Sequence, residues 1–316
     1  MSADAGTVLA LSGGVGGAKL ALGLYRILPP NTLTVVANTG DDFEHLGLTV
    51  SPDLDTLLYA LSGLDNPELG WGRRGETWNF MAALEALGGE SWFRLGDGDL
   101  ATHVERTRRL AAGENLSAIV DDFRRRLGIA ARLLPMSDDA VRTRVKTPAG
   151  WLDFQDYFVR QRCAPVVEAL EFVGAAAARP HPDVLAALDD PRLRLVAICP
   201  SNPFISIDPI LAVPGIREAL RQCRAPVVAV SPIVGGKAVK GPTAKMMAEL
   251  GLSVDAATPA RHYADIIDLY IADAADAAAV AGLDMPVVLT DTLMLSLADR
   301  EALAQKVLTA AGQLGK

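Results

Sequence analysis

The sequence predicts an α/β fold, a Rossmann-like doubly wound and mainly parallel sheet with a helical insertion that caps it. Three observations predict this class. Short apolar, β-branched runs recur along the chain, and helical patterns separate several of them, an alternation typical of parallel sheets with helices on both faces. A glycine-rich turn joins the first run to the first helix. Between residues 54 and 150 mostly helical patterns replace the alternation.

Five strands are predicted, at residues 7–11, 33–38, 193–198, 226–230 and 286–290. Helical patterns cover 206–222 and 242–250, and the alanine-rich segment 271–282 predicts a further helix. We expect a single α/β domain over 1–316, with the insertion at 54–150 forming part of the cleft.

Composition limits the function classes. The chain has 316 residues, of which 50% are hydrophobic, enough for a large core. A net charge of −8 argues against nucleic-acid binding. The three cysteines lack a C-x-x-C spacing, the longest apolar stretch is too short to cross a bilayer, and residues 1–6 carry no basic export segment. We therefore expect a soluble cytoplasmic protein without nucleic-acid or membrane partners, for which a homodimer would be an ordinary assembly.

The loop after the first strand reads LSGGVGGAKL. Bare backbone at the start of a helix is typical of a phosphate site, because N–H groups and the helix dipole both favour an anion. The loop is not a P-loop, since no Ser or Thr follows Lys19, and Lys19 also stands where the dinucleotide fingerprint needs its third glycine. A tight turn packing helix on strand is the alternative. The pattern favours an anion site that includes Gly13, Gly14, Gly16, Gly17 and Lys19.

The loop after the second strand, residues 38–56, carries Asp41, Asp42, Asp53 and Asp55. The glycine loop offers no hydroxyl to a metal, so Mg²⁺ would need oxygen ligands from elsewhere. Its usual set is one or two carboxylates with substrate phosphates and waters. A turn and a helix cap are the alternative, but capping explains one aspartate and not four. The cluster therefore predicts a magnesium site.

Two later loops also follow predicted strands. Ser201 and Asn202 would either cap the next helix or hold a nucleotide. The segment 231–245 is either a solvated basic loop or a second anion site, with backbone bared at two glycines and charge from three lysines: Gly235, Gly236, Lys237, Lys240 and Lys245. Ligands of such sheets bind beyond the carboxyl ends of the strands, so we expect these loops to line one cleft.

A weaker signal lies in RLGDGDLATH, where His103 follows Asp97 and Asp99 at the start of a helical pattern. The four histidines show no zinc spacing. This segment indicates a further ligand contact. Taken together, the residues predict a protein that binds a phosphorylated nucleotide with magnesium, and they leave the reaction type open.

Nine motifs, in consistent order, resemble the 2-phospho-L-lactate transferase family of coenzyme F-420 biosynthesis. They are LSGGVGGAKL, NTGDD, SPDLDTLLY, LGDGDLATH, ARLLPMSDD, FQDYFVR, PSNPFISIDPIL, VPGIR and SPIVGGKAVKGP. The resemblance implies a magnesium-dependent transferase that moves a phospho-acid from a guanosine-diphosphate-linked donor and releases GMP. The implied acceptor is the ribityl hydroxyl of the deazaflavin 7,8-didemethyl-8-hydroxy-5-deazariboflavin. The acid stays open among 2-phospholactyl, phosphoenolpyruvyl and phosphoglyceryl groups.

The resemblance also implies residue roles. Asp55 and Arg94 would hold the deazaflavin, Asp41 and Asp42 would bind the metal together with Asp55, and Asp42 and Asp55 would be catalytic. The glycine loop and the lysine loop would enclose the guanosine phosphates. The chain departs from the family at Gly98, where an arginine is usual, so no basic contact is expected there.

A second function class remains open at this level. A related family of similar fold binds nucleotide sugars or dinucleotides and regulates cell-wall metabolism without turnover. It shares the glycine loop and some aspartates. Deazaflavin binding would discriminate between the two, because a nucleotide-sugar sensor should not show it.

Overall fold

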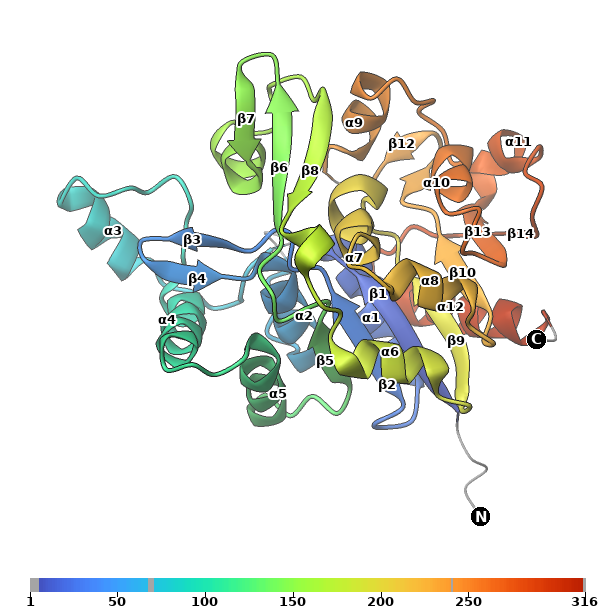
Figure 1. Cartoon of the computed structure of the whole chain (residues 1–316), viewed down its shortest axis with the longest axis horizontal. Coiled ribbons are helices and arrows are strands. Elements are labelled where there is room, and N and C mark those ends of the chain that lie inside the picture. Colours follow the sequence, from blue (N-terminus) through green and yellow to red (C-terminus); the bar gives the residue numbers. More distant parts are fainter. Residues whose placement is uncertain (1–5, 68–70, 240, 315–316) are drawn as a thin grey trace.

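The computed structural model describes residues 6–67, 71–239 and 241–314, and its centre is a seven-stranded sheet (Figure 1). All neighbouring strands of this sheet pair in parallel. In spatial order they are β14 (Val287–Thr290), β13 (Leu269–Asp273), β10 (Val227–Val230), β9 (Leu193–Ile198), β1 (Thr7–Ser12), β2 (Leu33–Ala37) and β5 (Arg132–Pro135).

The strand order reverses once, between β1 and β9. The chain builds outward from β1 through β2 to β5, then returns to the other side of β1 and continues through β9 to β14. This is the order of the doubly wound nucleotide-binding folds, and their ligands bind in the crevice where the order reverses. The topology therefore places the glycine loop, which follows β1, at the edge of that crevice.

Helices cover both faces of the sheet, because successive side chains of a strand point to opposite sides. In β1, Val8 and Ala10 belong to one hydrophobic core and Leu9 and Leu11 to the other. One face carries α1 (Gly14–Ile27), α2 (Pro52–Ser62), α5 (Leu116–Arg126) and α12 (Leu297–Gly312). The other carries α6 (Pro182–Asp189), α7 (Asp208–Leu211), α8 (Ile216–Arg221), α9 (Thr243–Glu249) and α10 (Ala257–His262).

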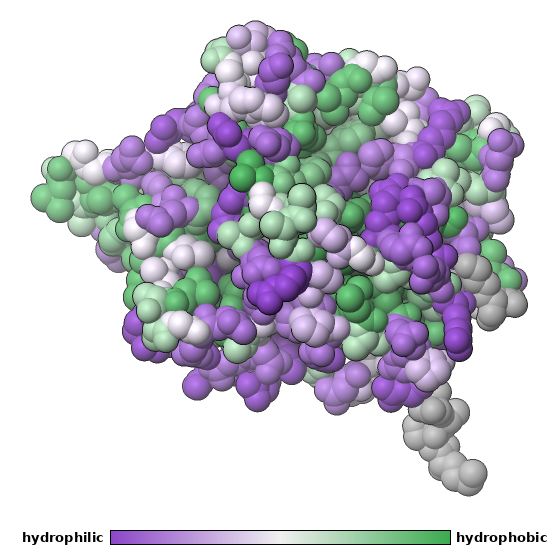
Figure 2. Space-filling view, in the orientation of Figure 1, coloured by the Kyte–Doolittle hydropathy of each residue, from purple (hydrophilic) through white to green (hydrophobic). Residues whose placement is uncertain are grey.

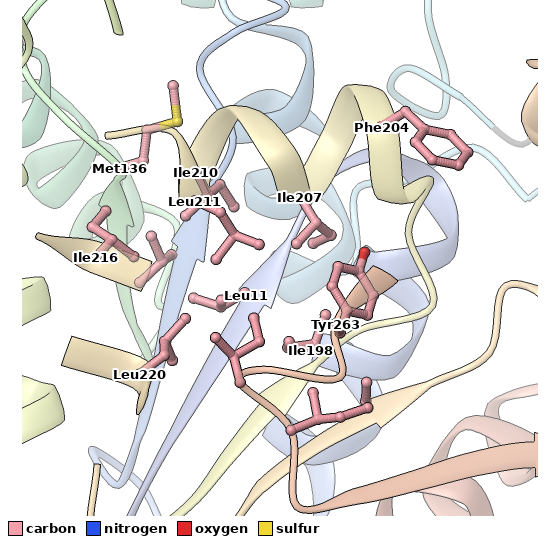
Figure 3. Close-up of a cluster of buried hydrophobic side chains, with 14 of the residues drawn as sticks. Leu11, Met136, Ile198, Phe204, Ile207, Ile210, Leu211, Ile216, Leu220 and Tyr263 are labelled. Carbon is pink, nitrogen blue, oxygen red and sulfur yellow. The ribbon is translucent and has the colours of Figure 1, made fainter. Parts of the chain in front are cut away.

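Figure 3 shows this second core, where Leu11 and Ile198 of the central strands meet side chains of α7 and α8. The π-helix η3 (Pro203–Ile207) leads directly from β9 into α7. Short π-helical segments are frequent at functional sites. Ile207, the last residue of η3, packs in this core and so anchors the segment that follows Ser201 and Asn202.

Smaller elements surround the carboxyl edge of the sheet. Two hairpins are β3 (Phe43–His45) with β4 (Leu48–Val50) and β11 (Ile233–Val234) with β12 (Lys237–Ala238). A three-stranded antiparallel sheet contains β6 (Arg142–Thr147), β7 (Gly150–Asp153) and β8 (Ala169–Val173), with η1 (Asp156–Arg160) after β7. The remaining helices are α3 (Asn79–Ala86), α4 (Asp97–Ala111), η2 (Ala175–Ala177), η4 (Ala274–Asp276) and α11 (Ala277–Val280).

The predicted fold class is confirmed, and all five predicted strands are present. Two strands of the main sheet, β5 and β13, were not predicted from the sequence. The sequence analysis was wrong about the start of the alanine-rich segment, since Ile271–Asp273 belong to β13 and only a short helix follows. Residues 54–150 hold α3 and α4, which lie with the β3–β4 hairpin at the end of the molecule opposite β14 (Figure 1). They also hold α5 and β5, an edge strand of the main sheet.

The surface mixes polar and apolar residues, and Figure 2 shows hydrophobic residues gathered at the projecting end that α3 forms. Leu87, just after α3, is 87% exposed. Within the described part of the chain, we find no helix with the length and apolar character that a bilayer crossing requires.

Candidate active site

A cleft of about 700 Å³ opens at the carboxyl ends of β1 and β9, where the strand order reverses. Most of the predicted site residues line it: Gly13, Gly14, Gly16, Lys19, Asp41, Asp55, Arg94, Ser201 and Asn202. Five predicted residues are not among its lining: Gly17, Asp42, Gly235, Gly236 and Lys237.

Close packing explains three of the four glycines in the first loop. A Cβ at Gly13 would lie 2.6 Å from Ser206 Cβ, and one at Gly16 would lie 2.5 Å from the Pro200 carbonyl oxygen. A Cβ at Gly17 would collide with the hydroxyls of Ser12 and Ser201. These glycines let α1 start against the β9 loop, so the tight-turn alternative accounts for them and the loop still forms one wall of the cleft.

The fourth glycine and Lys19 tie the loop to other segments. Gly14 has a φ of 63°, which favours glycine, and its N–H donates to Asp53 Oδ1 at 2.6 Å. The protein's own carboxylate thus takes one N–H at the start of α1. Lys19 Nζ donates to the Met294 carbonyl oxygen at 2.7 Å, which joins α1 to another cleft-lining segment.

Two buried carboxylates converge beside this loop. The Asn38 side-chain amide donates to Asp41 Oδ1 at 3.0 Å and to Asp53 Oδ2 at 2.9 Å. Burial and the nearby negative charge of Asp53 raise the pKa of Asp41 well above its usual range. Burial also raises the pKa of Asp53 to about 6, despite the hydrogen bonds from Asn38 and Gly14. Both carboxylates line the cleft, so a cation bound between them would relieve their repulsion.

The side chain of Asp42 does not line the cleft. Its Oδ2 accepts from Ser51 Oγ at 2.8 Å, while its buried Oδ1 has no hydrogen-bond partner. Burial raises its pKa to about 7. Asp42 therefore lies behind the cleft wall, although the sequence analysis expected it to be a metal ligand and a catalytic residue.

Asn202 has the capping role that the sequence left open, and Ser201 joins two loops. Ser201 Oγ donates to the Gly13 carbonyl oxygen at 2.7 Å, which ties the β9 loop to the glycine loop. Asn202 Oδ1 accepts from the Phe204 N–H at 2.9 Å and caps η3. Both also line the cleft.

Asp55 is held by a buried arginine that the sequence analysis did not single out. Arg106 is fully buried, donates from Nη1 to Asp55 Oδ2 at 3.1 Å, and donates from Nη2 to Asp55 Oδ1. Arg106 also contacts the Thr49 carbonyl oxygen and His103 Nδ1. Because both oxygens of Asp55 are engaged, its side chain is fixed on the cleft wall as a hydrogen-bonded ion pair.

Aromatic side chains form the outer part of the cleft. Trp92 and Phe93 line it, and they pack with Phe43 and His45 of the β3–β4 hairpin at centroid distances of 4.8 to 6.1 Å. Arg94 lies over the Trp78 ring at 4.5 Å. Flat apolar walls with a few polar groups suit an aromatic ligand.

The segment 231–245 lines the cleft in part, as expected, but the backbone N–H groups bared at its two glycines already have a partner within the protein. Gly235 and Gly236 form the turn of the β11–β12 hairpin, and their N–H groups donate to the two oxygens of Asp276 at 2.9 and 2.7 Å. Lys237 is exposed beside this turn. Lys245 Nζ donates to Glu249 at 2.6 Å and to the Pro165 carbonyl oxygen at 2.7 Å, and Lys240 lies outside the described residues.

The described residues contain no group of three or more His, Cys, Asp or Glu side chains placed to hold a metal ion. A magnesium ion that takes two carboxylates and completes its shell with substrate phosphates and water does not need such a group. Asp41 and Asp53 fit that smaller donor set, because they converge on one amide and their negative charges repel.

Comparison with known proteins identifies the family of this chain and its activity. Residues 8–306 match the model of the family described as 2-phospho-L-lactate transferase CofD. The chain belongs to this family. It is therefore a transferase of coenzyme F-420 biosynthesis that moves a phospho-acid from a guanosine-diphosphate-linked donor to the deazaflavin precursor. The expected family and activity are confirmed, and membership favours this transferase over the regulator alternative.

Several similar proteins are named phosphoenolpyruvate transferase. The one from Kitasatospora aureofaciens is 43% identical over 310 residues, covering 96% of each chain. The one from Streptomyces coelicolor is 43% identical over 304 residues, covering 94% of this chain and 95% of the relative. The one from Mycobacterium tuberculosis is 39% identical over 312 residues, covering 90% and 94%.

A solved structure of a UPF0052 family member from Bacillus halodurans aligns with this transferase at a TM-score of 0.67. The alignment covers 96% of this chain and 98% of that one at 15% sequence identity. At such low identity the likeness shows the fold alone, and it agrees with the doubly wound sheet.

Proposed function

We propose that the transferred group of this transferase is phosphoenolpyruvyl. The observation that supports this choice is full-length similarity, at 42% to 43% identity, to relatives named phosphoenolpyruvate transferase. Phosphoenolpyruvate, phospholactate and phosphoglycerate differ by few atoms, so the acid is selected by a few side-chain contacts within an otherwise shared site.

The two ends of the cleft suit the two substrates. The guanosine-diphosphate part of the donor would lie over the start of α1 and the β9 loop, because N–H groups and the helix dipole favour phosphate there. Ser201 and Asn202 fix that wall. The deazaflavin ring would lie against Trp92 and Phe93, with its ribityl chain directed toward Asp55.

We assign the metal to Asp41 and Asp53 rather than to Asp42 and Asp55. Asp42 lies behind the wall, and both oxygens of Asp55 are engaged by Arg106. When bound, Mg²⁺ would offset the negative charge of the diphosphate and of the leaving GMP. Asn38 holds the two carboxylates in place through its single amide nitrogen.

The test is turnover with competing donors. The purified protein would receive Mg²⁺, the deazaflavin precursor and an equal mixture of guanosine-diphosphate-linked phosphoenolpyruvate, phospholactate and phosphoglycerate. GMP release and the product masses are measured together. We expect one dominant product, the phosphoenolpyruvyl phosphodiester. A dominant phospholactyl or phosphoglyceryl product would contradict the choice of acid, and GMP release that does not depend on Mg²⁺ would contradict the metal assignment.

A further inference from the structure

The helix α4 packs on the rest of the molecule through a polar stripe. Asp99, His103 and Arg106 are spaced i, i+4 and i+7, so they share one face of the helix. His103 and Arg106 are the only buried side chains of α4, and Asp99 and His103 line the cleft. A helix that buries an imidazole and a guanidinium instead of apolar side chains is costly unless these groups are paired and have a function.

The neighbours of these three side chains determine which atoms donate and which accept hydrogen bonds. A guanidinium only donates, so His103 Nδ1, 3.4 Å from Arg106 Nη1, is the acceptor and the ring proton lies on Nε2. Nε2 lies 3.2 Å from Asp99 Oδ2. The Tyr59 hydroxyl donates to Asp99 Oδ1 at 2.5 Å. Asp99 therefore accepts a hydrogen bond at Oδ1, whereas Oδ2 only lies near His103 Nε2 without a well-formed hydrogen bond.

The charges of this cluster leave it one proton short of neutrality. With both carboxylates ionised and His103 in the tautomer above, the two carboxylates bring two negative charges and Arg106 brings one positive charge. Burial alone would raise the pKa of Asp99, but contact with His103 and Tyr59 holds it below its usual value, so the carboxylate is ionised. The cluster can thus take up one proton without creating a net positive charge in the cleft wall.

Asp99 is the more exposed of the two carboxylates in the cluster. Its side chain is 15% exposed, compared with 6% for Asp55 and 2% for His103. Both oxygens of Asp55 are held by Arg106, whereas the contact between His103 Nε2 and Asp99 Oδ2 is off the line of a well-formed hydrogen bond. A hydroxyl group of the acceptor could therefore approach Asp99 Oδ2.

We propose that Asp99 is the general base of the transfer, and that Tyr59, His103 and Arg106 are positioning residues that act through it. This inference rests on the proposed function. As the terminal ribityl oxygen bonds to the phosphorus that carries the acid, the hydroxyl proton passes to Asp99 Oδ2. The bond from this phosphorus to the bridging oxygen breaks, and its electron pair leaves with GMP. Aspartate accepts a substrate hydroxyl proton in the same way in protein kinases.

The main test replaces Asp99 with asparagine, which keeps the size and one acceptor oxygen but is not a base. We expect Asp99→Asn to lower kcat by about 100-fold or more, the usual range for losing a general base. The deazaflavin affinity, followed by its fluorescence, and the donor affinity should stay within about threefold, since the role is in the transition state. The matched control is Glu105→Gln, which removes one charge from the exposed side of α4 and should keep normal turnover.

Chemical rescue keeps the proposal testable if the asparagine variant is unstable. Asp99→Ala leaves room for a small carboxylate, so added formate should restore turnover in a saturable way, and chloride at equal ionic strength should not. His103→Gln should lower kcat by about 10-fold without raising the KM for either substrate, as expected for a residue that positions the base.

The outcomes separate the two proposals. If the wild-type protein forms no phosphodiester from any donor, the proposed function fails and the role of Asp99 fails with it. If the wild-type protein turns over and Asp99→Asn retains a kcat within about fivefold, Asp99 is not the base. Loss of turnover in Asp99→Ala that formate does not rescue would also overturn the proposal.

Discussion

Two glycine turns in this transferase look alike in sequence and differ in what they do. The first, GGVGGAK, starts α1 at the point where the strand order of the sheet reverses. The second, GGK, is the turn of a small hairpin that borders the cleft, although the three turn residues themselves do not line it. In each, an aspartate from a distant segment accepts backbone N–H groups: Asp53 for Gly14, and Asp276 for Gly235 and Gly236.

The two turns differ in the position of the aspartate that accepts their backbone N–H groups. Asp53 lines the cleft and shares the Asn38 amide with Asp41, so it can exchange partners when a phosphate or a cation arrives. Asp276 is 4% exposed, and both of its oxygens are occupied by the hairpin turn. Bare N–H groups therefore do not define an anion site unless the fold also leaves space for the anion.

The largest predicted effect is that of Asp53→Asn. The substitution removes one of the two carboxylates that we assign to the metal. It also weakens the hydrogen bond that the Gly14 N–H donates to this side chain. We expect turnover to fall by about 100-fold or more and the Mg²⁺ requirement to rise, as for removal of a principal electrostatic group. Turnover is measured against Mg²⁺ concentration, with circular dichroism as the control for folding. A normal Mg²⁺ dependence in the variant would remove Asp53 from the metal site.

The second prediction tests the glycines themselves. A Cβ in Gly16→Ala would meet the Pro200 backbone at 2.5 Å, so the loop must shift. We expect a loss of about 1–3 kcal/mol in unfolding free energy, as in other overpacked sites, and a larger loss of donor affinity than of deazaflavin affinity. The matched control is Gly235→Ala, which has open space around it but a φ of 58°. Its cost should be confined to about 1–2 kcal/mol of stability. Equal effects of both variants on donor affinity would contradict the distinction between the turns.

The strands and the two turns differ in how well the sequence predicts them. Strands such as β1, β2 and β9 are continuous apolar runs, so their prediction was secure. β13 was missed because its last residues, up to Asp273, were assigned to the alanine-rich segment that continues directly from it. The position of the glycine loop at the cleft followed from the rule on strand ends, whereas the capture of the second turn by Asp276 depends on a contact across 40 residues that no local pattern reveals.

The roles of the aspartates and of α4 also depend on contacts between segments that are distant in the sequence. Asp42 lies in the loop after β2 and Asp53 in the first turn of α2, and of the two only Asp53 lines the cleft. The stripe of Asp99, His103 and Arg106 was visible as i, i+4 and i+7 spacing on a helix without an apolar face. That spacing was a usable signal, but the partner Asp55 comes from a separate helix.

The third prediction concerns the second turn. Asp276→Asn should leave two backbone N–H groups with one acceptor oxygen between them and cost about 1–3 kcal/mol of stability. Turnover at a temperature well below unfolding should stay within about twofold, because the turn glycines and Asp276 do not line the cleft. Thermal unfolding and steady-state turnover are measured on the same preparation. A loss of turnover as large as that of Asp53→Asn would show that the hairpin belongs to the active site.

The smallest predicted effect is that of Lys237→Ala. Sequence reasoning placed this lysine beside the guanosine phosphates, but the structure has it exposed next to a turn that Asp276 already holds. Removing an exposed charge should change donor affinity by less than about twofold at moderate salt, with a small effect on association rate at low salt.

Lys19→Ala is the comparison variant, because Lys19 lines the cleft and joins α1 to the Met294 carbonyl oxygen. Its loss should weaken donor binding clearly more. Donor affinity is measured by titration at two salt concentrations. A Lys237 variant that loses donor affinity at both would mean that the hairpin closes over the bound donor, and the two glycine turns would then act as one site.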